Sequence, residues 1–177
     1  MLRHVVICHV FIIIQVIYLT AHETPKNYGE FTLKIINFHI CKGPKRIDCT
    51  NITSRIHNET NLILNFEIKK NATINRGKIV SMINNKPLVR LQMKNPCDHL
   101  FMKTIFQSVF NITQNCLFMK SYQVLNVDID EVAKKYYGGM FLYGNITFKS
   151  IFYNDECNFS CTVAEVSLSP KKKKQTK

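Results

Sequence analysis

The number and placement of cysteines constrain this chain more than any other feature of its sequence. Cys8 lies in an apolar N-terminal stretch, and six further cysteines follow it: Cys41, Cys49, Cys97, Cys116, Cys157 and Cys161. An even number of cysteines is typical of domains that fold in an oxidising compartment, where thiols pair and disulfides persist. We therefore predict three disulfides, although the spacing alone does not choose among the possible connectivities.

The N-terminus indicates that the chain is exported. Arg3 precedes an apolar run over residues 5–18, and the sequence turns polar from Thr20, which is the layout of a secretory signal peptide. The run is shorter than a membrane-spanning helix needs and is interrupted by His9 and Gln15, so an uncleaved anchor is the less favoured alternative. We predict a signal peptide over residues 1–21, one domain over residues 22–169, and a basic disordered tail over residues 170–177.

Glycosylation acceptors give an independent test of the compartment. Chance placement of the asparagine, serine and threonine residues of this chain would give roughly two N-x-[ST] triplets. The sequence has more, at Asn51, Asn58, Asn71, Asn111, Asn145 and Asn158. The excess agrees with export and predicts N-glycosylation at these positions, with Asn158 the weakest because it lies between two cysteines.

Several segments alternate apolar and polar residues with period two, the pattern of a strand with one face on a core and one in water. These rows are Phe31, Leu33 and Ile35; Leu62, Leu64, Phe66 and Ile68; Val89, Leu91 and Met93; Ile146, Phe148 and Phe152; and Thr162, Ala164, Val166 and Leu168. The spacing changes to four over residues 99–110, which predicts a short helix, and a second helical turn is expected over residues 130–137, before two glycines. Many short strands with few helices predict a mostly antiparallel β-sandwich.

Four segments of the sequence resemble a known family. They are the pair Cys41 and Cys49, NPCDHLF at residues 95–101, FNITQNC at residues 110–116, and GGMFLYGNITFKSIFY at residues 138–153. Together they look like a large insect family of small secreted proteins that share a domain of unknown function and are related to the ML lipid-recognition and ganglioside-activator proteins. Two departures concern the turn after Cys116: the family usually has proline where Leu117 stands, and glycine where Lys120 or Ser121 stands.

The resemblance implies an immunoglobulin-like, ML-like β-sandwich whose sheets separate to hold a lipid or other hydrophobic small molecule, and some relatives resemble chemosensory proteins. The expected cavity residues are Leu64, Phe66, Leu91, Phe101, Phe106, Phe118, Phe141, Phe148 and Phe152. The expected disulfides join Cys97 to Cys116, and Cys41 and Cys49 to Cys157 and Cys161, with local pairing of each neighbouring couple as the alternative. From the residues alone, rows of phenylalanine usually indicate a packed core without a cavity.

The sequence carries no catalytic pattern, and we expect no enzyme, no cofactor and no metal. The G-x-S-x-G motif is absent, the histidines are scattered, and no cysteine or histidine pairs have zinc-site spacing. Asp128, Asp130 and Glu131 lack the glycine and terminal glutamate of a calcium loop, so we interpret them as helix-start residues. A secreted basic ribonuclease, with two histidines and a lysine brought together by the fold, is the enzyme alternative.

The cysteine and strand patterns together with the resemblance predict a secreted protein that binds a lipid or other hydrophobic small molecule, and the resemblance implies a chemosensory role. The alternative is an extracellular module that binds a protein or glycan without an internal ligand. In that case a cell-surface receptor or an anionic glycan would contact the lysines of the tail at residues 171–174. We expect a monomer with no nucleic-acid partner.

Overall fold

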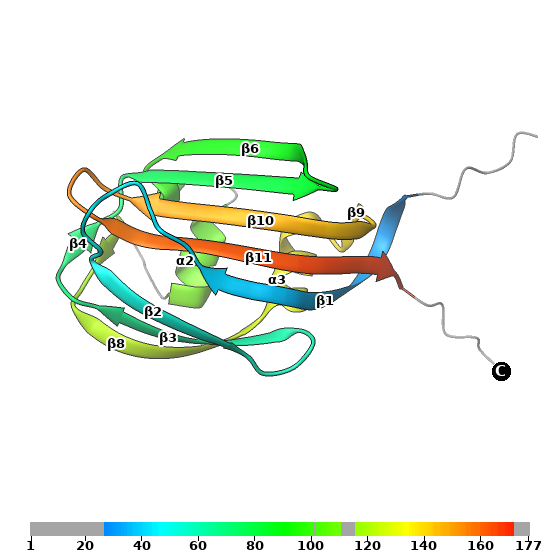
Figure 1. Cartoon of the computed structure of the whole chain (residues 1–177), viewed down its shortest axis with the longest axis horizontal. Coiled ribbons are helices and arrows are strands. Elements are labelled where there is room, and N and C mark those ends of the chain that lie inside the picture. Colours follow the sequence, from blue (N-terminus) through cyan, green and yellow to red (C-terminus); the bar gives the residue numbers. More distant parts are fainter. Residues whose placement is uncertain (1–26, 101, 111–115, 172–177) are drawn as a thin grey trace, which may run out of the picture.

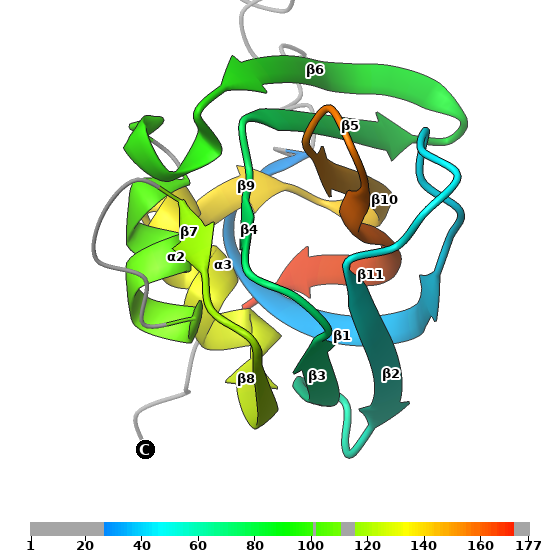
Figure 2. The same cartoon turned by 90° about the vertical axis from the view of Figure 1, so that its left-hand side faces the viewer.

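The structure, a computed structural model, describes residues 27–100, 102–110 and 116–171 of the chain. The domain has three walls around one interior: a large sheet, a small sheet beside it, and two helices that close the remaining side (Figures 1 and 2). The predicted signal peptide, Phe101, Asn111 and residues 172–177 of the tail lie outside the described residues. Within the described residues, no helix is long and apolar enough to cross a membrane.

The large sheet has six antiparallel strands in the order β6-β5-β10-β11-β1-β9. In chain order these are β1 (Tyr28–Ile40), β5 (Arg76–Ile83), β6 (Lys86–Lys94), β9 (Met140–Leu142), β10 (Gly144–Tyr153) and β11 (Asn158–Pro170). Strands β5 and β6 form a hairpin through Asn84 and Asn85, which both have positive φ. A two-residue turn with positive φ at both positions matches the twist of the flanking strands.

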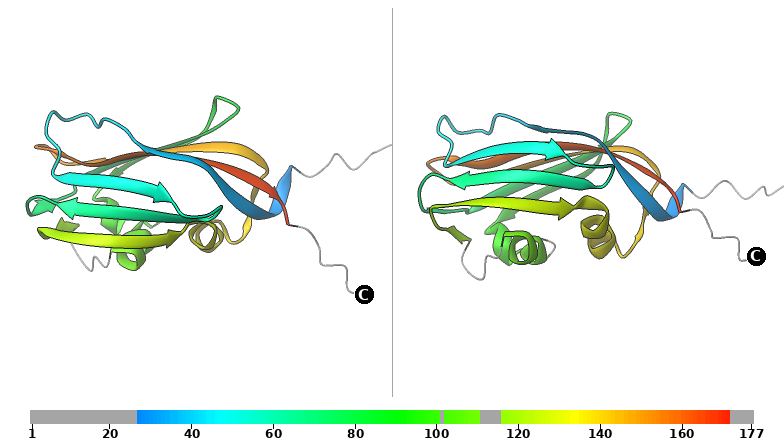
Figure 3. Two further views of the ribbon diagram at one scale, coloured as in Figure 1. Left: turned by 60° about the horizontal axis from the view of Figure 1, so that its bottom comes forward. Right: turned by 90° about the horizontal axis from the view of Figure 1, so that it is seen from below.

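The small sheet consists of β2 (Thr50–Ile56), β3 (Asn61–Ile68) and β8 (Ser121–Asp128), in that order. A short pair, β4 (Ala72–Thr73) with β7 (Leu117–Phe118), lies at one end. Figure 3 shows the small sheet beside the large one, with the helices on the far side of β8. Strand β8 therefore pairs with β3 along one edge, and its other edge faces the helices.

Two α-helices and one 3-10 turn complete the domain: η1 (Pro96–Asp98), α2 (Lys103–Phe110) and α3 (Ile129–Tyr137). The side chain of Asp128 caps α3 by accepting a hydrogen bond from the backbone N–H of Glu131 at 3.0 Å. Gly138, with φ of 62°, ends the helix in a left-handed conformation. These features agree with the interpretation of the acidic residues as helix-start residues.

Three disulfides cross-link the domain, joining Cys41 to Cys161, Cys49 to Cys157, and Cys97 to Cys116. The first two fasten the β1–β2 loop to the start of β11, and the third closes the segment that contains α2. The first two disulfides join residues more than 100 positions apart, with sequence separations of 120 and 108 residues. Three disulfides fit an extracellular protein.

The predicted fold class is confirmed: the domain is a mostly β, antiparallel, disulfide-bonded sandwich. All five period-two rows lie in strands, namely β1, β3, β6, β10 and β11. The predicted class gave one short helix, whereas the described residues contain two α-helices, and the second corresponds to the helical turn expected over residues 130–137. Strand β11 runs to Pro170 and the backbone N–H of Lys171 donates to Glu30, so regular structure extends beyond the predicted tail boundary.

The glycosylation acceptors differ in their surroundings. Asn51, Asn58, Asn71 and Asn145 are exposed. Asn158 is 3% exposed, and its Nδ2 donates to the Lys45 carbonyl and to Asp48 Oδ1, both at 2.8 Å. A glycan on that nitrogen would replace one of its two N–H donors and has no room beside a side chain that is almost fully buried, which corrects the prediction for Asn158.

Candidate functional site

The apolar interior is divided into two main clusters along the length of the domain. One contains Phe66, Phe106, Phe118, Phe152 and Phe159 together with η1 and the Cys97–Cys116 disulfide. The other contains Phe31, Leu33, Leu62, Ile146 and Val166 and packs against α3. Since a small domain usually has one contiguous core, the boundary between the clusters is the place to look for a site.

Strand β3 shows where that boundary falls. Leu62 belongs to the α3 cluster and Phe66 to the α2 cluster, and Leu64 lies between them. Leu64 pairs with Leu125 on β8, the edge strand that faces the helices. The side chain of Leu125 is only partly buried. The interior is therefore incompletely covered at the boundary between the two clusters, on the side of the helices.

The large sheet carries small side chains at the same level. On β10, Phe148 and Ser150 lie between Ile146 of one cluster and Phe152 of the other, and their neighbours across the ladder include Ser81, Thr162 and Ala164. Residues paired across an antiparallel ladder point to the same face of the sheet. Four of these five side chains are small, but Ser150 also pairs with Ile79, which packs against the α2 cluster, so this part of the wall carries small side chains among larger ones.

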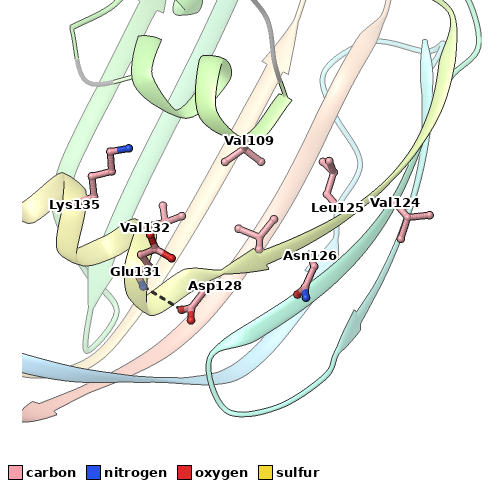
Figure 4. A pocket seen from close by; sticks show the side chains of 9 residues that line it. Val109, Val124, Leu125, Asn126, Asp128, Glu131, Val132 and Lys135 are labelled. Atoms are coloured by element: carbon pink, nitrogen blue, oxygen red, sulfur yellow. Dashed lines mark hydrogen bonds between the residues drawn. The ribbon is translucent and has the colours of Figure 1, made fainter.

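A cleft of about 300 Å³ opens beside this level, between α2, α3 and β8 (Figure 4). Its apolar lining comes from three elements: Val109 on α2, Leu125 and Val127 on β8, and Val132 on α3. In Figure 4 these elements surround one space, with the strands of the large sheet behind it. The volume lies at the lower end of the range of small-molecule pockets.

The rim of the cleft is polar and carries both signs of charge. Asn126 and Asp128 come from β8, Glu131 comes from the first turn of α3, and Lys135 comes from its last turn. Asp128 is engaged in capping α3, whereas Lys135 is exposed beside the opening. An apolar lining with a few polar groups at the mouth suits a molecule with an apolar body and a polar end group.

Most of the predicted cavity residues are packed in the interior. Phe66, Phe106, Phe118 and Phe152 are buried in the α2 cluster, with ring centroids 5.2 Å apart for Phe106 and Phe152. Leu91 packs against this cluster, and Leu64, Phe141 and Phe148 are partly buried against the other. None of these eight residues lines the cleft, and their role toward a ligand stays a prediction.

Sequence reasoning did not find the residues that do line the cleft. The segment SYQVLNVD of β8 alternates, but its apolar residues fall on both faces, with Val124 60% exposed and Leu125 partly buried. Val132 lies in a helix that the sequence indicated only weakly. The available signal was the alternation of Leu125 and Val127, which matches the row of β3 with which they pair.

No metal-binding group of three or more histidine, cysteine, aspartate or glutamate side chains occurs in the described part of the chain.

The fold and the cleft define the class of this protein as a disulfide-bonded, two-sheet β protein whose helical wall holds a small apolar cleft. No protein-family model matches the sequence. No curated protein matches it.

Among solved structures, the chain is similar to chicken MD-1, whose crystal structure was determined in complex with lipid IVa. The two chains are 14% identical, the similarity covers 78% of this chain and 98% of that chain, and the TM-score is 0.35. A function for this chain therefore has to be inferred from its own cleft and packing.

Proposed function

We propose that this protein binds a small, mainly apolar molecule, such as a lipid, in the cleft between β8, α2 and α3. The observation that carries the proposal is the position of the cleft. It opens at the level where the two core clusters part, so a ligand that fills it extends the apolar interior. Removing apolar surface from water is the main driving force for such binding.

The lining sets the chemistry of the ligand. Valine and leucine side chains offer no hydrogen bonds, so the inner part of the ligand is hydrocarbon. The polar end remains at the mouth, where Lys135 suits an anionic group such as a carboxylate, and the backbone of β8 at Asn126 adds polar atoms. A single-chain amphiphile, such as a fatty acid, meets both conditions.

A longer ligand would continue into the interior. The small side chains Ser81, Ser150, Thr162 and Ala164 line the opposite wall at this level, and chain atoms of the ligand would pack against them. We also propose, on the disulfides and the apolar leader, that the protein works outside the cell. A chemosensory role, in which a secreted protein presents such a ligand, is consistent with this chemistry.

The absence of tryptophan from the whole chain gives a direct assay. Glu131→Trp places one indole at the mouth, on an exposed residue in the first turn of α3 that lines the cleft. We expect a fatty acid to shift the emission of this tryptophan to shorter wavelength with saturation, because the bound ligand removes water from the indole. Val163→Trp, on the opposite face of the large sheet, is the control and should not respond.

A second variant tests whether the cleft itself is occupied. Val132→Trp fills the cleft and should weaken binding of a fluorescent fatty acid at least tenfold, whereas Val163→Trp should leave it unchanged. Native mass spectrometry of the protein from a eukaryotic secretory host should show a bound lipid. The proposal fails if no lipid co-purifies and neither fatty acids nor lysophospholipids alter the Glu131→Trp emission.

A further inference from the structure

The outer face of the large sheet is strongly basic. Strands β5, β6 and β10, which are adjacent in the sheet, contain six cations and no acidic residue: Arg76, Lys78, Lys86, Arg90, Lys94 and Lys149. The register places Arg90, Val80 and Lys149 in one row across the three strands, and the next row contains Lys78. Ile146 and Phe152 are buried on the other face, so the alternation of β10 turns Lys149 outward.

Four of these cations are close neighbours on that face. Lys78 is the diagonal neighbour of Arg90 and Lys94 on β6 and of Lys149 on β10. Diagonal neighbours across an antiparallel ladder have their Cα atoms about 7–8 Å apart. Lys78 therefore lies at the centre of a group of four positive charges, which we call the sheet cations: Lys78, Arg90, Lys94 and Lys149.

No salt bridge in the described part of the chain involves any of the four sheet cations. The nearby Arg76 is paired with Asp155 at 3.3 Å. On β11, the next strand of the sheet, Glu165 is the single acidic residue. Like charges held this close destabilise a sheet, and their positive potential attracts a partner of opposite charge.

We propose that the sheet cations bind a sulfated polysaccharide of the extracellular matrix or cell surface. The sulfates of a linear polysaccharide can contact cations that are distributed over three adjacent strands. The planar guanidinium of Arg90 can donate two hydrogen bonds to one sulfate. This site is distinct from the cleft, which lies on the helical wall, and the proposal does not depend on the proposed function.

A lipid bilayer fits this face less well. Peripheral attachment to membranes normally combines cations with apolar side chains that enter the interface. In the described residues of β5 and β10, no large apolar side chain is exposed, since Val80 and Ile151 are half-buried. Val89 of β6 is exposed, but it is paired with the buried Ser81 on the inner side of the sheet.

The test compares two quadruple variants of the full chain. Each removes four positive charges by replacing three lysines and one arginine. One is Lys78→Gln, Arg90→Gln, Lys94→Gln and Lys149→Gln. The control is made at four exposed residues on the other walls: Arg55→Gln, Lys69→Gln, Lys103→Gln and Lys120→Gln. Binding to heparin, to chemically desulfated heparin and to phosphatidylserine vesicles is measured over a range of salt concentrations.

We expect the sheet variant to bind heparin more than tenfold more weakly at physiological salt, because each lost ion contact lowers the affinity on the order of twofold. Its affinity should also depend less steeply on salt concentration, since fewer cations contact sulfates. The control variant should lose much less, and desulfated heparin should bind wild type weakly. Replacing the three lysines by arginine, with Arg90 kept, should retain heparin binding and shows that charge is the cause.

Three results would overturn the proposal. The first is an equal loss of heparin binding in the sheet and control variants, which would indicate a diffuse effect of net charge. The second is complete loss of binding when residues 171–177 are deleted, with the sheet variant unaffected, which would assign the glycan to the lysine tail. The third is loss of vesicle binding alone, which would assign this face to membranes.

Discussion

Phe106 provides the sharpest test of whether the phenylalanine rows form a packed core or border empty space. Its side chain is 2% exposed and lies on α2 at the centre of one core cluster. Its ring centroid is 5.2 Å from that of Phe152, 5.8 Å from Phe110 and 6.1 Å from Phe118. The rings of Phe152 and Phe118 meet it nearly at right angles, the edge-to-face arrangement that aromatic pairs favour.

These contacts set the expected cost of Phe106→Ala. Removing a buried phenylalanine side chain costs about 3–5 kcal/mol, through lost burial and the cavity left behind. Two edge-to-face contacts, each worth about 0.5–1.5 kcal/mol, place Phe106 in the upper half of that range. We therefore expect a loss of about 4 kcal/mol in the free energy of unfolding, and a fall in Tm of about 8–16 °C for a domain of this size.

The assay is urea unfolding with the disulfides intact, followed by far-ultraviolet circular dichroism, with Tm from calorimetry. Phe38→Ala is the matched control, because Phe38 is only partly buried at the margin of the other cluster. It should cost about 1–2 kcal/mol, in keeping with an incompletely buried ring. If Phe106→Ala costs less than about 1 kcal/mol, or less than the control, Phe106 borders open space and the packed-core reasoning is refuted.

Two further substitutions test local features. Asp128→Ala should destabilise the domain by about 1 kcal/mol, because the capping bond to the backbone N–H of Glu131 is lost; chemical denaturation measures this, and Asp128→Asn, which retains a capping oxygen, should recover most of it. Asn158→Ala should cost about 1–3 kcal/mol and loosen the loop between Cys41 and Cys49, because it leaves the partly buried carbonyl of Lys45 without its donor. Hydrogen exchange across that loop should rise, and unchanged protection would contradict the assignment of Asn158 as its anchor.

Local sequence patterns indicated much of the architecture. A period of two records which side chains of a strand are buried, and five such rows lie in strands of the structure. The same reasoning missed other strands, among them β5 and β8. Strand β5 places Ile79 and Val80 in succession, and β8 exposes Val124 while partly burying Leu125, so neither segment shows a clean alternation. The Asn84–Asn85 pair was the overlooked signal for the β5–β6 hairpin.

The acceptor at Asn158 shows a different limit. Its triplet meets the sequence requirement for glycosylation as well as that at Asn145 does. Only the folded chain shows that one amide is exposed on a strand and that the other is buried against the backbone of a loop 113 residues away. The difference depends on long-range packing, which a triplet cannot record.

Cysteine count and side-chain alternation are local properties, and they were sufficient to predict a disulfide-linked β protein. Tertiary structure alone decided which phenylalanines pack together and where the interior opens. The cleft combines Val109, Leu125 and Val132 from three elements, and the sheet cations come from the β5–β6 hairpin and from β10, which is distant from it in the chain. Both arrangements follow from strand order and from the placement of the helices against β8. These are set by contacts between distant segments, which a local pattern does not encode.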